Sequence, residues 1–456
     1  MEEENTVLRS GPLIDATGIL LLLVTISVFL WPLFIFFPPI PPTERDALLE
    51  THSPVGLGSS KKPKKKESGR SLGGSPASAT ATTTTIRDLW IYPIKSCKGI
   101  QVAESKVRPW GLEFDRLYTF AQLKSPFPVS LDSPNDEKTA HKWEFITQRQ
   151  FSLLATVRVE LYVPDVDKAR GRPLDSKVSD SFLLVRFPWQ ERGLHGAIGW
   201  LAAKLLRGRK AVPEKEFILP VTFPSEREIE ARSYSHEQVA IWKETVTALN
   251  MEADLPRELR LYLGVSNRLG IFRIDPARLR EVYRCAPTRV EAGYQPVTGF
   301  QDAYPLHLLN LSSVRDFGAK IENDDFRGGL DPRRFRANII VDGKDTSPYD
   351  EETWKKVRFT GGAKKNSSST FHVSCRTVRC KMPNVDQENG IRHPVEPDRS
   401  LRQLREVDAG ARLMGCLGMQ LTPLFDEATG PELESWVEVG MEVAVLERGE
   451  HLYIRQ

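Results

Sequence analysis

Five cysteines are the side chains of this 456-residue sequence best suited to chemistry: Cys97, Cys285, Cys375, Cys380 and Cys416. An odd, sparse set does not resemble the disulfide framework of a secreted protein, so we expect a reducing compartment. A cysteine with a special role would there be a metal ligand or a nucleophile, and the others small buried hydrophobic residues. The eight histidines show no metal-ligand spacing, so a zinc site is not expected.

Cys380 lies in the segment SCRTVRCKMPNVDQENG, directly after Arg379. A thiolate is both soft and charged, which suits a metal that prefers sulfur ligands. The guanidinium of Arg379 is expected to favour the thiolate electrostatically. Residue type alone leaves a second interpretation open, in which Cys380 is a buried structural residue.

Several cationic and hydroxyl groups could hold an anion. The stretch LWIYPIKSCKG presents Lys95, Ser96 and a backbone amide after a strand, and these group types bind phosphate. Arg116 in GLEFDRLYTF and Arg149 in ITQRQ lie in similar strand settings. An arginine in such a place can equally make a structural salt bridge.

The elements that must position these groups are mostly strands. Short β-rich runs separated by Gly, Pro and Asp/Asn turns begin at Ile86 and predict a barrel or sandwich. Around residues 254–283 two helical patterns, LPRELRLYLG and DPARLREVYR, indicate a boundary. The last part combines a helix, SVRDFGAKI, with the strands RANIIVDG, KKVRFT and EVAVLE. We predict a β-rich α+β fold with domains at 86–253 and 254–456, as the chain length favours.

The N-terminal part differs in composition from the rest. No charged residue occurs from Ala16 to Phe37, which predicts a transmembrane helix at about 16–37 within a membrane anchor at 1–42. A cleavable signal peptide is the alternative, but its apolar core is usually shorter. The lysines after this run predict cytosolic C-terminal domains. Residues 43–85, rich in Pro, Ser, Gly, Thr and Lys, predict a disordered linker.

Charge excludes one class of partner. The chain has 63 basic and 60 acidic residues, a formal net charge of +3. So small an excess gives no strong field for nucleic acid, and we expect no nucleic-acid partner.

Three segments follow one another in the second part: FQDAYPLHLLNLSS, DPRRFRANIIVDG and SCRTVRCKMPNVDQENG. With IYPIKSCKG and GLEFDR of the first part, they resemble the MOSC family, named for its place at the C-terminus of molybdenum cofactor sulfurases. The resemblance extends from about Ile86 to the end. It implies an N-terminal β-barrel domain followed by a MOSC β-barrel domain, here with a transmembrane helix before them.

The resemblance also implies a site. Cys380 matches the cysteine that ligates molybdenum, and would be both catalytic residue and metal ligand. The implied cofactor is molybdenum-molybdopterin, with no pyridoxal phosphate site. The implied cofactor-binding residues are Lys95, Ser96, Arg116, Tyr304, Arg336, Asn338 and Arg379. The chain departs from the family at Thr377, where members carry another cysteine, and at Ala303–Tyr304, where animal members carry a Thr-Ser pair.

Within the family, the anchored arrangement resembles the mitochondrial amidoxime-reducing enzymes. This implies an oxidoreductase that reduces small N-hydroxylated substrates. A b-type cytochrome and its NADH-dependent reductase would supply electrons. The N-terminal helix would contact membrane lipid, with the mitochondrial outer membrane favoured over the endoplasmic reticulum. The alternative is a molybdenum cofactor sulfur-carrier or handling protein without reductase turnover.

Overall fold

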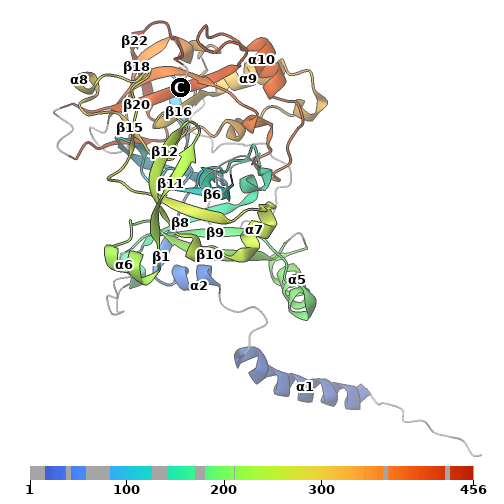
Figure 1. The fold of residues 1–456 in the computed structure, drawn as a ribbon. Coiled ribbons are helices and arrows are strands. Elements are labelled where there is room, and N and C mark those ends of the chain that lie inside the picture. The colour runs from blue at the N-terminus through green and yellow to red at the C-terminus, as the bar shows by residue number, and fades with distance from the viewer. Residues whose placement is uncertain are drawn as a thin grey trace, which may run out of the picture. The chain divides into compact units, whose positions relative to one another are not determined.

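The computed structural model describes residues 16–36, 43–57, 83–125, 141–169, 180–209, 211–344, 346–362, 368–426 and 432–454 (Figure 1). Two compact units are distinguished. One comprises Met1–Thr43 and Trp189–Glu214, and the other comprises Glu44–Pro188 and Lys215–Gln456. The described part of the first unit contains the helices α1 (Ala16–Phe36) and α5 (Gly193–Arg207).

Helix α1 is apolar, and its described side chains, 17–31, are exposed. Within the described ranges, no helix combines the length and apolarity needed to cross a membrane. This finding contradicts the predicted single-pass localisation, with its transmembrane helix at about 16–37 and its outer-membrane placement.

The beginning of the predicted linker is folded. Residues 44–55 form helix α2 (Glu44–Leu49) and strand β1 (His52–Val55). Strand β1 pairs antiparallel with β8 (Arg158–Pro164), and Leu48 packs on Tyr162 and Leu184. The prediction of disorder over 43–85 is therefore wrong at its start, because Leu48 and the β1 backbone gain partners on this sheet. Residues 58–82 lie outside the described part.

The second unit contains a four-stranded sheet and a closed five-stranded barrel. The four-stranded sheet has the order β1-β8-β9-β10, where β9 is Phe182–Pro188 and β10 is Glu214–Pro220. The barrel runs β11 (Ser235–Ile241), β12 (Glu244–Asn250), β13 (Leu269–Ile274), β6 (Tyr118–Lys124) and β7 (Lys142–Phe145). Trp143, Phe145 and Phe272 fill its core.

An eight-stranded sheet forms the rest of this unit's framework (Figure 1). Its order is β17 (Ile339–Asp342), β16 (Leu306–Asn310), β20 (Cys416–Leu424), β19 (Ser369–Val378), β18 (Trp354–Thr360), β22 (Glu442–Arg448), β2 (Thr85–Ile91) and β3 (Ile100–Val102). Because β2 also pairs with β17, seven of these strands form a ring. Helix α9 (Leu311–Ala319) buries Val314 and Phe317 in the adjoining core.

The other helices and strands of the described part are short. They are β4 (Glu104–Arg108), β5 (Gly111–Leu112), α4 (Val166–Ala169), α6 (Glu226–Ala231), α7 (Arg257–Leu263), β14 (Arg280–Glu281), α8 (Arg289–Ala292), β15 (Val297–Thr298), α10 (Asp398–Leu404) and β21 (Ser435–Glu438). A three-stranded sheet has the order β21-β4-β5.

The sheets do not divide at the predicted boundary of 253/254. Strands β2 and β3 belong to the sheet of the C-terminal part, whereas β13 completes the N-terminal barrel. Helix α7 confirms one helix predicted near the boundary. The other, DPARLREVYR, is a turn followed by β14, since Arg280 donates to the carbonyl of Gly299 and β14 pairs with β15. The β-rich class is confirmed, but its two parts exchange strands.

Candidate functional site

A cavity of about 960 Å³ is lined by residues of both the barrel and the eight-stranded sheet. The barrel contributes the turn between β11 and β12, and the sheet contributes residues before β16 and the end of β19. All eight residues predicted from the sequence line this cavity: Lys95, Ser96, Arg116, Tyr304, Arg336, Asn338, Arg379 and Cys380. Residues nearly 300 positions apart in the sequence thus meet at one site.

Cys380 follows strand β19 and is the one cysteine of the described chain that lines the cavity. It is partly buried and free. Burial raises the pKa of its thiol, while the backbone N–H of Met382 and then the charge of Arg149 act in the opposite direction. Arg379 lowers the pKa as expected, but it ranks behind these effects. The protein groups around Cys380 therefore favour the neutral thiol.

Arg379 links two other segments of the cavity wall by hydrogen bonds. It is buried, its Nε donates to the carbonyl of Leu417 at 2.8 Å, and its Nη1 donates to the carbonyl of Phe335 at 3.3 Å. Its Nη2 contacts Nε2 of His307. Burial lowers the pKa of Arg379 to about 9 and that of His307 well below its usual value. A neutral imidazole can accept the hydrogen bond that Arg379 offers.

Lys95 and Ser96 lie where the chain turns after β2. The Lys95 ammonium donates to Asp302 Oδ1 and to the carbonyl of Phe300, both at 2.6 Å. Burial lowers the pKa of Lys95, and the carboxylate of Asp302 offsets part of this effect. Ser96 is buried with φ 67°, and its carbonyl accepts from Gln148 Nε2 at 2.7 Å. Such left-handed backbone is uncommon outside glycine and concentrates at functional sites.

Arg116 and Arg336 both stack on the buried ring of Tyr92, with guanidinium carbons 4.6 and 4.2 Å from its centroid. Arg116 Nη1 donates to Asn338 Oδ1 at 3.0 Å, and Nη2 donates to the Arg336 carbonyl at 3.2 Å. Asn338 in turn donates from Nδ2 to the carbonyl of Trp90 at 3.1 Å. Both arginines have positive φ, 50° and 54°. This network fixes two cations side by side.

Two buried polar atoms of the cavity lining have no hydrogen-bond partner among the described atoms. They are Arg336 Nη2 and Thr377 Oγ1. Buried polar groups nearly always have a partner, so an unpaired guanidinium nitrogen and hydroxyl mark a place for one. A guanidinium prefers an anionic acceptor such as a phosphate.

Tyr304 occupies the position of the family's Thr-Ser pair. Its ring is buried, and its hydroxyl donates to the carbonyl of Arg284 at 2.6 Å. The hydroxyl therefore has a protein partner already.

The cavity lining also contains residues outside the eight predicted ones. Arg149, which the sequence offers as a possible anion-binding residue, stacks over Trp242 at 4.1 Å, and Trp242 Nε1 donates to Asp302 at 3.2 Å. Trp242 and Lys243 form the two-residue turn between β11 and β12. This turn contains neither Gly nor Asn, so its sequence carries no hairpin signal. His307 and Thr377 are two further lining residues.

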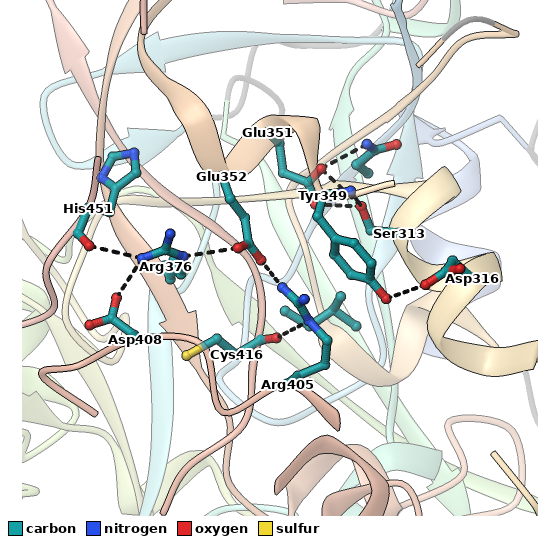
Figure 2. A network of polar contacts seen from close by, with 12 residues as sticks. Ser313, Asp316, Tyr349, Glu351, Glu352, Arg376, Arg405, Asp408, Cys416 and His451 are labelled. Carbon is teal, nitrogen blue, oxygen red and sulfur yellow. Dashed lines mark hydrogen bonds and ion pairs between the residues drawn. The ribbon is translucent and has the colours of Figure 1, made fainter. Parts of the chain in front are cut away.

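A buried polar network anchors strand β19 next to the cavity (Figure 2). Arg376, which lines the cavity, donates to Glu352 at 3.0 Å, to Asp408 at 3.1 Å and to the His451 carbonyl at 2.9 Å. Arg405 pairs with the other oxygen of Glu352 and stacks on Tyr349 at 3.7 Å. Removing one partner from such a buried set costs about 3–5 kcal/mol, so the network fixes the strand that leads to Cys380.

Together these residues present one thiol and several cations to an enclosed space. In the part of the chain that is described, no group of three or more His, Cys, Asp or Glu side chains is placed to hold a metal ion. The donor set fits a metal that takes one protein sulfur and is otherwise held by an anionic ligand.

Two family models match the chain. The MOSC N-terminal beta barrel domain matches residues 83–178, and the MOSC domain matches residues 295–444. Mitochondrial amidoxime reducing component 2 of Rattus norvegicus is 21% identical over 341 residues, 75% of this chain and 77% of that protein. Mitochondrial amidoxime-reducing component 1 of Mus musculus is 23% identical over 367 residues, 79% of this chain and 82% of that protein. Molybdenum cofactor sulfurase of Arabidopsis thaliana is 31% identical over 142 residues, 30% of this chain and 15% of that protein.

Proposed function

Because this chain belongs to the MOSC domain family and also carries the family's N-terminal barrel domain, we propose that it is a molybdenum cofactor-dependent oxidoreductase that reduces N-hydroxylated compounds. One observation carries the proposal: the eight predicted residues line a single cavity that contains one thiol. The names of the rat and mouse relatives, which align over three quarters or more of this chain, support amidoxime reduction.

The residues present fit the cofactor. Cys380 Sγ would ligate molybdenum, and the unpaired Arg336 Nη2 would bind its phosphate together with Lys95 and Arg116. Thr377 Oγ1 would supply a further hydrogen bond. When bound, the cofactor would supply the two-electron chemistry that removes oxygen from the substrate nitrogen.

The protein's own residues would bind the cofactor and orient the substrate. Arg379 ties Leu417 and Phe335 to the cavity wall and so fixes the backbone next to Cys380. Asp302 keeps the proton on Lys95 Nζ despite its burial. Trp242 is 45% exposed and also lines the cavity, so its indole offers a flat surface to an entering substrate.

Reduction requires two electrons per turnover, and we propose a b-type cytochrome with its NADH-dependent reductase as the source. The described cavity lining has Cys380 as its one thiol, so no dithiol in that lining stores the two electrons. The proposal therefore requires an external donor.

The test uses the full chain purified from cells that make the cofactor. Molybdenum and pterin are quantified, and reduction of a model amidoxime is followed with chemically reduced methyl viologen, which replaces the natural donors. We expect near-stoichiometric molybdenum and amidine formation in the wild type, and loss of both in Cys380→Ser. Cys375→Ser is the matched control, because Cys375 is buried and does not line the cavity. Absence of molybdenum from the wild type, or equal loss in both variants, contradicts the proposal.

A second candidate is a sulfur-carrier or cofactor-handling protein. It is favoured by the Arabidopsis sulfurase segment, whose 31% identity exceeds that of the rat and mouse relatives. In this case Cys380 would carry a persulfide. Mass spectrometry that finds a persulfide on Cys380, with no amidine formed by cofactor-loaded protein, would favour this candidate over the reductase.

A further inference from the structure

Two cysteines outside the cavity lining form a pair. Cys285 and Cys375 are both free, and Cys285 packs against the buried cluster that contains Cys375. They come from distant parts of the chain: Cys285 follows β14 with φ 52°, and Cys375 lies in β19. Cys375 is completely buried, whereas Cys285 is partly exposed. One sulfur can thus meet a solute while the other is protected.

Apolar side chains and the C-terminal segment of the described chain surround the two cysteines. Val282 and Tyr304 pack with Cys375 in one small cluster, and Cys285 packs against it. The Cys285 sulfur lies 3.5 Å from the carbonyl of Leu452 and is also approached by the backbone N–H of Ile454. The Tyr304 hydroxyl donates to the carbonyl of Arg284, the residue before Cys285. The C-terminal segment and Tyr304 therefore both contact the part of the chain that carries the two thiols.

We propose that Cys285 and Cys375 are a peroxide-reactive dithiol that closes to a disulfide. The Cys285 thiolate attacks hydrogen peroxide or an alkyl hydroperoxide, so that an S–O bond forms, the O–O bond breaks, and water or an alcohol leaves. Cys375 then attacks the sulfur of the Cys285 sulfenic acid, and the S–S bond forms as water leaves. The two thiols lose two electrons and two protons, and the peroxide is reduced by the same two electrons.

The environment assigns different roles to the two sulfurs. The hydrogen bond from Cys375, then the Ile454 N–H, lower the pKa of Cys285 to about 6, despite the opposing effect of burial. The pKa of Cys375 is raised well above its usual value by the same hydrogen bond and by burial. Cys285, which is partly exposed and has the lowered pKa, is therefore the attacking sulfur, whereas the buried Cys375 resolves the sulfenic acid.

Closure has a consequence at the cavity, because Tyr304 lines it and belongs to the cluster in which both cysteines pack. A disulfide requires the sulfurs to approach to about 2.05 Å and removes both S–H groups. The packing around the Tyr304 ring changes as the sulfurs move. Oxidation of the pair thus changes the packing of a cavity residue without reacting with Cys380.

Trypsin separates the cysteines concerned, which makes the test direct. Cleavage after Arg284 and Arg289 releases CAPTR with Cys285, and cleavage after Lys365 and Arg376 releases NSSSTFHVSCR with Cys375. The full chain is treated with hydrogen peroxide, remaining thiols are alkylated, and the digest is analysed without reductant. We expect these two peptides joined by a disulfide, free thiols reduced from five to three in the denatured protein, and reversal by dithiothreitol.

Two variants test the order of events. Cys375→Ser should accumulate a sulfenic acid on the Cys285 peptide, trapped by dimedone, whereas Cys285→Ser should show neither this adduct nor the linked pair. The proposal is overturned if the wild type gives no linked pair, or if Cys285 joins the Cys380 peptide instead. None of these readouts requires bound molybdenum or turnover, so the result is independent of the proposed reductase function.

Discussion

Lys95 and Asp302 form an ion pair in which the ammonium is buried and the carboxylate is more than half exposed, with Nζ and Oδ1 2.6 Å apart. Burial disfavours the charged lysine, so its stability depends on the carboxylate. The charged form of Lys95 in the cavity wall therefore depends on the carboxylate of Asp302.

Substituting Asp302→Asn should lower the free energy of unfolding by about 1–3 kcal/mol, because the buried ammonium loses its charged partner. Lys95→Met removes the buried charge, and adding Asp302→Asn to it should cost little more. Urea denaturation of both single variants and the double variant measures this coupling. Additive losses would show that the two residues act independently.

Arg336 should be required for cofactor retention, because its Nη2 is buried without a described partner. We expect Arg336→Met to lower molybdenum and pterin content several-fold while circular dichroism stays unchanged. Arg334→Met is the matched control, since Arg334 belongs to the preceding turn, pairs with Asp386 at 2.8 Å and does not line the cavity. Equal cofactor loss in both variants would contradict a specific role.

The buried carboxyl of Glu351 should make stability depend on pH. Burial raises its pKa from 4.5 to about 7, although Ser313 and Asn310 donate to it. A raised native pKa means that the folded state binds the proton more tightly, so this contribution is complete below pH 4.5 and is lost as the pH rises through 7. The loss amounts to at most about 3 kcal/mol. Denaturation curves should show that the free energy of unfolding declines less between pH 4.5 and 8 in Glu351→Gln than in the wild type. Parallel pH profiles for the two proteins would refute this.

Gly418 and Gly440 provide a matched comparison of crowding, because both have positive φ, 83° and 95°. A Cβ at Gly418 would lie 2.6 Å from His307 Nε2 and from the Leu308 carbonyl, whereas a Cβ at Gly440 meets nothing within 4 Å. Gly440→Ala should therefore cost only about 1 kcal/mol of backbone strain. Gly418→Ala should cost more and disturb the His307–Arg379 contact. Thermal unfolding compares them, and equal losses would exclude crowding as the cause.

The sequence was sufficient to identify the cavity residues because ordered motifs carry them, as with Lys95 in IYPIKSCKG and Arg336 in DPRRFRAN. It was insufficient for residues whose role depends on tertiary contact. Trp242 reaches the cavity through a hairpin turn with φ 56° that has no turn signal in its sequence. The packing of Cys285 against the cluster of Cys375 depends on how the segment after β14 lies against β19, which local patterns do not encode.

The strand order was the least predictable part of the fold. The predicted boundary assigns residues 86–102 to the first domain, yet β2 pairs with β17 and β22, and β3 pairs with β2. Local periodicity determines that a segment is a strand but not its partner. The apolar run at the N-terminus was likewise read correctly as a helix, α1, but incorrectly as a transmembrane span.

The pairing of β2 with both β17 and β22 also determines when the protein can fold. On a translating ribosome, β2 leaves the exit tunnel long before β22 (Glu442–Arg448) has been made. The ring cannot close before β22 is available, so the strands made earlier keep open edges until then. An N-terminal fragment that ends before β22 therefore cannot close the ring.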